Sequence, residues 1–295
     1  MKGPVEGFTP GAGGCTLRTL HWPVPNPVGR VQLVHGLSEH MGRYGLLAHA
    51  LNEAGYSVWG HDHRGHGKSE GERGVVGRFQ DLVADLHHLR GLADELAPGP
   101  GDPFLISHSM GALVTTRYLQ ERWGGGTPPQ GARPLPGVVI SAPWLATAVE
   151  IPLHVRLALP LLRRVAADLP VPRPIRPEVL TRDPEQAQAY ARDGLVVRAL
   201  AVSFYDQVRR EQEAALAEGL PPGIPALVLV PQADELTDPA ASAAWGARAG
   251  DAVELWSLPE TRHEPFNDIN RNKIFQRIVE WLDRLRKDAA GKETE

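Results

Sequence analysis

The sequence predicts an α/β fold in which a mostly parallel sheet is flanked by helices and a helical insertion follows late in the chain. Three observations lead to this prediction. Short apolar runs alternate with longer helix-like segments, as in repeated strand–helix units. The chain has 295 residues, of which 42% are hydrophobic, enough to bury one large core. About eighty residues between two of the apolar runs contain no convincing strand.

The elements can be placed along the chain from these runs. The expected strands are short β-branched or apolar runs, at Arg30–His35, Tyr56–Trp59, Pro103–Ser107, Gly137–Ser141, Pro225–Val230 and Ala252–Leu258. The expected helices lie between them, at roughly Tyr44–Ala54, Phe79–Leu96, Gly111–Arg122, Pro239–Arg248 and Asn270–Arg286. The Gly- and Pro-rich segment 124–136 predicts a surface loop.

The long interval without a strand divides the chain into a core and an insertion. We expect residues 1–142 and 220–295 to form the core and residues 143–219 to form a helical cap. Its first part, Leu145–Leu169, is apolar and interrupted by prolines, whereas Pro184–Glu218 is polar and helical in character. Because open α/β sheets bind ligands at the carboxyl ends of their strands, an insertion there should act as a lid.

Composition excludes several classes of protein. The chain carries 31 basic and 35 acidic residues, a net charge of −4, which excludes the broad basic face of a nucleic-acid binder. The single cysteine, Cys15, excludes a disulfide framework and a cysteine-rich metal site. The first residues lack the apolar segment of a secretory signal, and charged residues and prolines interrupt the most apolar stretch, Trp144–Leu162. We therefore expect a cytoplasmic protein.

The strongest local motif is F-L-I-S-H-S-M-G-A-L-V, from Phe104 to Val114. An apolar strand leads through Ser109 directly into a helix that begins with small residues, the context of a nucleophile elbow of pattern G-x-S-x-G. Gly111 supplies the small residue that a closely passing backbone requires, while Ser107 replaces the first glycine. Ser109 is therefore the candidate nucleophile, and the alternative is a serine that only caps the helix.

A serine nucleophile needs a base, and the base needs an orienting carboxylate. The chain order serine, acid, histidine places both after the later strands. Asp234 is the favoured acid because it lies near the end of a strand, with Glu235 as the weaker alternative. Asp238 precedes a proline and a helix-like run, so we interpret it as a helix N-cap. His263 is the candidate base, since it is the only histidine beyond His154; the alternative is a structural or exposed histidine.

Acyl transfer also requires hydrogen-bond donors for the oxyanion. We expect one to be the N–H of Met110, directly after the nucleophile at a helix N-terminus. The second is expected to be the N–H of Leu37, which follows the pair His35-Gly36 after an early apolar strand. Gly36 would let this backbone approach the reacting carbonyl.

Several other histidines superficially suggest a metal site. The segment H-D-H-R-G-H, from His61 to His66, partly matches the H-x-H-x-D-H pattern of binuclear hydrolases. Gly65 stands where the aspartate ligand belongs, and Arg64 would bring a positive charge into the site. We therefore expect no metal and no organic cofactor, and we interpret this segment as a hydrogen-bonded turn near the site. His108 is also expected to be structural.

Together these segments resemble the α/β-hydrolases of the monoacylglycerol lipase and lysophospholipase group. The matching stretches follow the expected order over most of the chain: H-G-L-S-E-H-M-G-R-Y, G-Y-S-V-W-G-H-D-H-R-G-H-G-K-S-E-G, S-H-S-M-G, A-D-E-L-T-D-P and H-E-P-F-N-D. The resemblance implies an α/β-hydrolase fold, a triad of Ser109, Asp234 and His263, and an oxyanion hole at Leu37 and Met110. It supports the reaction type better than the substrate, because the insertion is too divergent to match.

The residues and the resemblance predict a serine hydrolase of small-molecule or lipid esters with an apolar acyl part. Six apolar residues of the insertion are candidates to line an acyl-chain channel and to contact a lipid surface transiently: Leu153, Val155, Leu157, Leu159, Leu161 and Leu162. The alternative is that they only pack the cap against the core. A short-chain carboxylesterase, a peptidase or thioesterase with the same triad, and a non-enzymatic binding module stay open. The head group, the chain length and the oligomeric state are not predicted.

Overall fold

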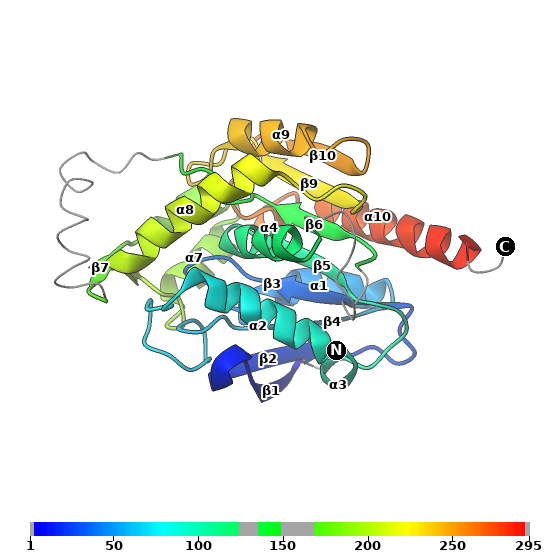
Figure 1. The fold of residues 1–295 in the computed structure, drawn as a ribbon, viewed down its shortest axis with the longest axis horizontal. Coiled ribbons are helices and arrows are strands. Elements are labelled where there is room, and N and C mark those ends of the chain that lie inside the picture. Colours follow the sequence, from blue (N-terminus) through cyan, green and yellow to red (C-terminus); the bar gives the residue numbers. More distant parts are fainter. Residues whose placement is uncertain (1–2, 124–134, 149–167, 293–295) are drawn as a thin grey trace.

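The computed structural model describes residues 3–123, 135–148 and 168–292 (Figure 1). Within these ranges, eight strands form the main sheet in the order β1-β2-β4-β3-β5-β6-β9-β10. The strands β1 (Val5–Pro10) and β2 (Thr16–Trp22) pair antiparallel to each other, and β2 is also antiparallel to β4. The remaining strands are parallel, as predicted: β3 (Gly29–Val34), β4 (Tyr56–His61), β5 (Phe104–His108), β6 (Val138–Ser141), β9 (Ala226–Pro231) and β10 (Val253–Leu258).

The amino-terminal hairpin of β1 and β2 is absent from the predicted strands, for a physical reason. β1 contains no apolar run, and it is exposed or half-buried along its whole length. β2 includes the charged residue Arg18, which is buried in ion pairs with Glu6 and Asp62. Both strands are therefore stabilised by pairing and long-range charge contacts that a local pattern does not reveal.

Helices cover both faces of the sheet (Figure 1). On one face, α2 (Phe79–Gly91), α4 (Met110–Trp123), α8 (Val202–Glu218) and α9 (Pro239–Ala247) contribute to one apolar cluster. On the other, α1 (Gly45–Glu53) and α10 (Arg271–Lys292) contribute to a second. The prediction of one helix over 79–96 is wrong in detail, because the backbone leaves helical angles at Leu92 (φ −92°, ψ 10°) and a short α3 (Ala93–Leu96) follows.

The insertion contains more regular structure than its sequence predicts. The strands β7 (Pro170–Pro172) and β8 (Ala199–Ala201) pair antiparallel, although no strand was expected there; three residues are too few to give a recognisable alternation. Two helices lie between them, α6 (Pro177–Leu180) and α7 (Pro184–Arg192). The six apolar channel candidates and most of the predicted loop 124–136 lie outside the described residues. The cap boundaries at 143 and 219 stay a prediction.

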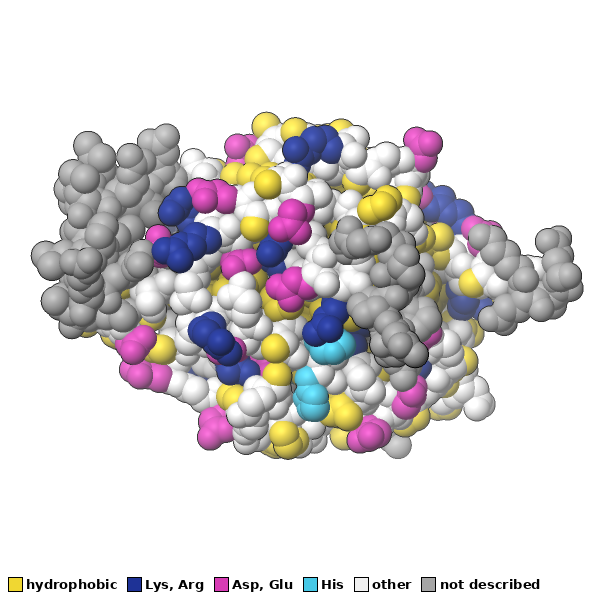
Figure 2. Space-filling model, viewed as in Figure 1, with side chains coloured by type: hydrophobic (Ala, Val, Ile, Leu, Met, Phe, Trp, Pro, Cys, Tyr) yellow, Lys and Arg dark blue, Asp and Glu magenta, His cyan; other side chains and the backbone are white. Residues whose placement is uncertain are grey.

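The surface carries charges of both signs. Lys and Arg side chains are interspersed with Asp and Glu over the face that Figure 2 shows. In the portion of the chain that the structure describes, no helix combines the length and the apolar character that crossing a membrane demands.

The parallel strands place the predicted site segments at one edge of the sheet. In the strand register, Val34 at the end of β3 lies opposite Ser107 of β5, and Pro231 at the end of β9 lies opposite Leu258 at the end of β10. Segments that follow these strands therefore meet at the same edge.

Candidate active site

Ser109 alone forms the turn between β5 and α4. Its φ of 52° lies in the left-handed region, which serine rarely adopts. The turn is fixed by hydrogen bonds: the Ser109 N–H donates to the carbonyl of Ser141 at 2.9 Å, and its own carbonyl accepts from the N–H groups of Ala112 and Trp144 at 3.0 and 3.2 Å. This is the strained strand–turn–helix geometry of a nucleophile elbow.

Small residues on each side of Ser109 allow this turn. A Cβ atom on Gly111 would lie 2.4 Å from the carbonyl oxygens of both Val34 and His35, so only glycine lets β3 pass so closely. Ser107, at the position of the usual first glycine, is fully buried, and its hydroxyl donates to the carbonyl of Val139 at 3.3 Å. The departure from the G-x-S-x-G pattern is therefore accommodated by a hydrogen bond to the neighbouring strand.

Three residues predicted from separate motifs meet in one hydrogen-bonded chain. The Nε2 atom of His263 lies 3.0 Å from Oγ of Ser109, and its Nδ1 atom lies 2.8 Å from Oδ2 of Asp234. All three residues are buried, with exposed fractions of 5% to 8%. With Asp234 ionised, Nδ1–H donates to the carboxylate, and Nε2 is left to accept the Ser109 hydroxyl proton.

The Asp234 carboxylate is held in place from both sides. Its Oδ1 accepts the N–H groups of Leu236 and Thr237 at 2.7 and 3.1 Å, and its Oδ2 accepts the Thr237 hydroxyl at 2.6 Å. Burial opposes ionisation, but the charge and hydrogen bond of His263, with these further donors, lower the pKa of Asp234 to about 2. The role of Thr237 was not predicted, although its place three residues after Asp234 lets its hydroxyl reach back.

The two competing carboxylates lie elsewhere. Glu235 is exposed and lies 3.4 Å from Arg176. Asp238 caps α9, where it accepts the N–H groups of Ala240 and Ala241 at 2.8 and 3.2 Å. Of the three candidates, only Asp234 contacts His263.

The loop after β3 lies directly against Ser109. A Cβ atom on Gly36 would come within 3.0 Å of the Cβ atom of Ser109, so glycine is required at this close approach. Among the described residues, no acceptor is hydrogen-bonded to the N–H of Leu37 or of Met110. Both groups are therefore free to donate to an oxyanion, and the N-terminus of α4 adds its dipole at Met110.

Hydrogen bonds of two histidines, His35 and His63, stabilise this loop. Nε2 of His35 accepts the N–H of His63 at 2.8 Å, and Nδ1 of His35 donates to the carbonyl of Gly36 at 2.7 Å. The ring of His63 in turn donates to the carbonyl of His35 at 3.0 Å. Burial lowers the pKa of both imidazoles well below their usual range, so they are neutral. Within the described ranges, no group of three or more His, Cys, Asp or Glu residues is placed to hold a metal ion.

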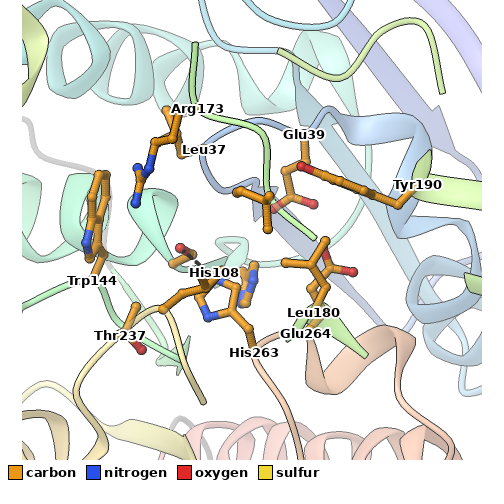
Figure 3. A pocket seen from close by; sticks show the side chains of 13 residues that line it. Leu37, Glu39, His108, Trp144, Arg173, Leu180, Tyr190, Thr237, His263 and Glu264 are labelled. Carbon is orange, nitrogen blue, oxygen red and sulfur yellow. Dashed lines mark hydrogen bonds between the residues drawn. The ribbon is translucent and has the colours of Figure 1, made fainter. Parts of the chain in front are cut away.

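A pocket lies over Ser109 and His263 (Figure 3). Figure 3 shows Glu39 and Tyr190 on one side of the two histidines, His108 and His263, and Trp144 and Arg173 on the other. Apolar side chains also line the pocket: Leu37, Ile175, Leu180 and Leu236. Several lining residues lie within 143–219, the range of the predicted insertion, where no sequence motif marked them.

Glu39 is a buried carboxyl on one wall of this pocket. Its Oε1 accepts the N–H of Gly36 at 2.5 Å and the hydroxyl of Tyr44 at 2.8 Å. Burial and the nearby charge of Glu264 raise the pKa of Glu39 to about 7, even though Arg43 favours its ionised form. Near neutral pH this group is therefore partly protonated and can both donate and accept hydrogen bonds.

We expect the acid limb of the pH profile of kcat/KM to have its midpoint above 6.5. Burial alone would lower the pKa of His263, but the charge and hydrogen bond of Asp234, with the charges of Glu264 and Glu39, raise it above its ordinary 6.5. A protonated imidazole cannot accept the Ser109 proton, so activity is lost as the pH falls through this pKa. The check is kcat/KM for an uncharged ester from about pH 5 to about pH 9. A midpoint below 6.5 would contradict this description of the site.

Comparison with known proteins places these features in a family. The model of the family described as serine aminopeptidase, S33, matches residues 25–270. The chain belongs to this family. Mouse monoglyceride lipase is 35% identical over 231 residues, which cover 77% of this chain and 72% of that protein. The monoacylglycerol lipase of Mycolicibacterium smegmatis is 30% identical over 286 residues, which cover 92% and 94% of the two chains.

A solved relative supports the same assignment. The structure of Paleococcus ferrophilus monoacylglycerol lipase superposes with a TM-score of 0.78 at 30% identity, covering 91% of this chain and 99% of that one. The predicted α/β-hydrolase fold, the family resemblance and the class of serine ester hydrolase are thereby confirmed. The family is described by an aminopeptidase, whereas the relatives from mouse and M. smegmatis are lipases by name.

Proposed function

We propose that the chain hydrolyses esters of the monoacylglycerol or lysophospholipid kind, with an apolar acyl group and a polar alcohol, through an acyl-enzyme. The observation that carries this proposal is the hydrogen-bonded chain from Ser109 through His263 to Asp234 at the base of a pocket with polar and apolar walls. The two relatives described above, from mouse and M. smegmatis, are lipases of monoacylglycerols by name, which supports this substrate class.

In the proposed first step, Ser109 Oγ attacks the ester carbonyl carbon while Nε2 of His263, 3.0 Å away, takes its proton. Asp234 holds Nδ1–H and stabilises the imidazolium. The oxyanion accepts the N–H groups of Leu37 and Met110. It then collapses, the carbon–oxygen bond to the alcohol breaks, and His263 returns the proton to the departing alkoxide.

The proposed second step regenerates the enzyme. His263 takes a proton from a water molecule, whose oxygen attacks the acyl carbonyl in the same oxyanion hole. The bond to Ser109 then breaks, the carboxylic acid leaves, and His263 returns the proton to Ser109. The mechanism requires neither a metal ion nor an organic cofactor.

We propose that the two walls of the pocket receive different parts of the substrate. Glu39, with a pKa of about 7, and the neighbouring Tyr190 suit the hydroxyl groups of a small alcohol. Leu236 and Ile175 offer an apolar path for the acyl group. The predicted cap, residues 143–219, would complete this path and contact a lipid surface transiently.

An aminopeptidase would instead have to bind a positively charged amino group. The carboxyls that line the pocket suit this poorly. Glu264 is already paired with Arg43 at 2.6 Å, and Glu39 is partly neutral because its pKa is raised to about 7. Both features favour an uncharged alcohol over an ammonium group, and hence an ester over a peptide N-terminus.

A series of p-nitrophenyl esters from acetyl to palmitoyl tests the substrate class. We expect kcat/KM to be highest for medium or long acyl chains, with 1-monoacylglycerols hydrolysed as well, because the proposed acyl path is apolar. A maximum at acetyl would indicate a short-chain carboxylesterase. Turnover of leucine p-nitroanilide with no ester hydrolysis would contradict the proposal, and a lack of turnover on every substrate would favour a binding module. The cytoplasmic location stays a prediction.

A further inference from the structure

We propose that Arg173 forms a subsite for an anionic group of the substrate, a carboxylate or a phosphate, beside the catalytic serine. This inference rests on the ester hydrolysis proposed above and adds a charge requirement to it. The residue lies in the insertion, directly after β7, and belongs to none of the sequence motifs.

The side chain of Arg173 is directed into the active-site pocket. It lines the same pocket as Ser109 and His263, and Figure 3 shows its guanidinium group beside Trp144, on the side opposite Glu39. Its backbone N–H donates to the carbonyl of Arg198 at 2.8 Å, which ties its segment to the residue before β8. Arg173 therefore extends into the pocket from a backbone segment that is hydrogen-bonded to the segment before β8.

Two aromatic rings orient the guanidinium. Its central carbon lies 5.3 Å from the ring centroid of Trp144 and 5.6 Å from that of Tyr205. Cation–π contacts of this kind hold the planar group while leaving its N–H edge available. A guanidinium oriented in this way loses less entropy when it binds a ligand.

Trp144 is itself fixed to the catalytic turn. Its backbone N–H donates to the carbonyl of Ser109 at 3.2 Å, and its indole N–H donates to the hydroxyl of Thr147 at 2.9 Å. The amide of Gln212 donates to its carbonyl at 3.0 Å. The ring that supports Arg173 is therefore tied by hydrogen bonds to the turn that carries Ser109.

The charge of Arg173 is not balanced within the described residues. No described carboxylate forms an ion pair with its guanidinium, and no described acceptor is hydrogen-bonded to it. Other arginines around the site have such partners: Arg43 pairs with Glu264, and Arg176 pairs with Glu235. The carboxyls of the pocket, Glu39 and Glu264, lie away from Arg173, on the opposite wall (Figure 3). An anionic group of a bound ester is therefore attracted to the Arg173 side.

The chemistry of a guanidinium defines the ligand class. Its planar fork of donors matches the paired oxygens of a carboxylate or a phosphate. Such an anion can belong to the alcohol, as in a glycerol phosphate ester, or to the acyl group, as in a half-ester of a dicarboxylic acid. Both sources offer the same group to Arg173, and they differ only in which side of the scissile bond carries it.

The test compares three esters of matched length: a neutral monoacylglycerol, the corresponding lysophosphatidate, and a glycerol half-ester of a dicarboxylic acid. We expect Arg173→Gln to lower kcat/KM for at least one anionic ester, relative to the neutral one, by about tenfold or more, mainly through KM. Arg173→Lys keeps the charge and should retain part of this preference. Arg176→Gln is the matched control. The Arg176 side chain is 76% exposed and does not line the pocket, so the ratio of kcat/KM for an anionic ester to kcat/KM for the neutral ester should not change.

The outcomes separate this inference from the proposed function. If Arg173→Gln lowers kcat/KM selectively for lysophosphatidate or for the half-ester, the subsite is supported. The ester that is affected shows whether the anion belongs to the alcohol or to the acyl group. A ratio that changes less than about twofold for both anionic esters in folded Arg173→Gln overturns it. If the wild-type protein does not hydrolyse the neutral monoacylglycerol but hydrolyses an anionic ester in an Arg173-dependent manner, the subsite is supported and monoacylglycerols are wrong as the proposed substrate.

Discussion

Replacing Ser109 with alanine is expected to lower kcat/KM for every ester by on the order of 10³-fold or more, with the fold intact. In the proposed mechanism the hydroxyl oxygen forms the acyl-enzyme, and no other hydroxyl is hydrogen-bonded to Nε2 of His263 among the described residues. Removal of one oxygen atom from a pocket wall leaves the packing around it unchanged, so the effect should fall on turnover. Initial rates on a p-nitrophenyl ester, together with Tm, measure both quantities.

Ser107→Ala is the matched control for this experiment. Ser107 lies at the end of β5, two residues before Ser109, but its hydroxyl donates to the carbonyl of Val139, away from the reacting atoms. Its loss should cost about 1 kcal/mol of stability and leave kcat within a few-fold of the wild-type value. Ser109→Ala activity above about a tenth of wild type would mean that another group attacks the ester.

Replacing Asp234 with asparagine is expected to lower kcat by roughly 10³- to 10⁴-fold. The amide can donate a hydrogen bond to Nδ1 of His263, which would hold the imidazole in the wrong tautomer and leave the imidazolium without its counter-charge. Thr237 would still hold the side chain through its backbone N–H, so the geometry should survive. The measurement is kcat on the same ester, with Tm to verify folding.

Asp238→Ala distinguishes the acid from its neighbour in the same loop. This carboxylate caps α9 and does not contact His263, so its removal should cost about 1 kcal/mol of stability and leave kcat near the wild-type value. The opposite pattern, a loss of kcat in Asp238→Ala with Asp234→Asn nearly harmless, would show that the acid is misassigned.

The residues that the sequence predicted best are those with a local signature. Ser109 lies between an apolar strand and a helix, and the geometry of that junction follows from the small residues at its sides. Asp234 and His263 follow the ends of strands whose apolar runs are unambiguous. Parallel strands bring such ends to one edge, and this explains why three distant motifs could be combined before their distances were known.

Other features depend on partners far away in the chain and could not be predicted. The pKa of Glu39 is raised by burial and by Glu264, more than two hundred residues later. Arg173 faces the pocket because two aromatic rings, one before and one after it in the chain, orient its side chain. Arg18 of β2 is likewise buried through ion pairs with Glu6 of β1 and with Asp62, which follows β4. In each case the deciding contact is tertiary, and no local pattern encodes it.

The most direct test of the central claim, that Ser109 is the nucleophile of a serine ester hydrolase, is to identify the residue that a fluorophosphonate probe modifies. After labelling, digestion and mass spectrometry, we expect one adduct on the peptide that contains Ser109. It should be absent from Ser109→Ala and strongly reduced in His263→Ala, because the probe reacts with a serine that is activated by its base. An adduct on a different serine, or ester hydrolysis that continues with Ser109 unmodified, would contradict the account.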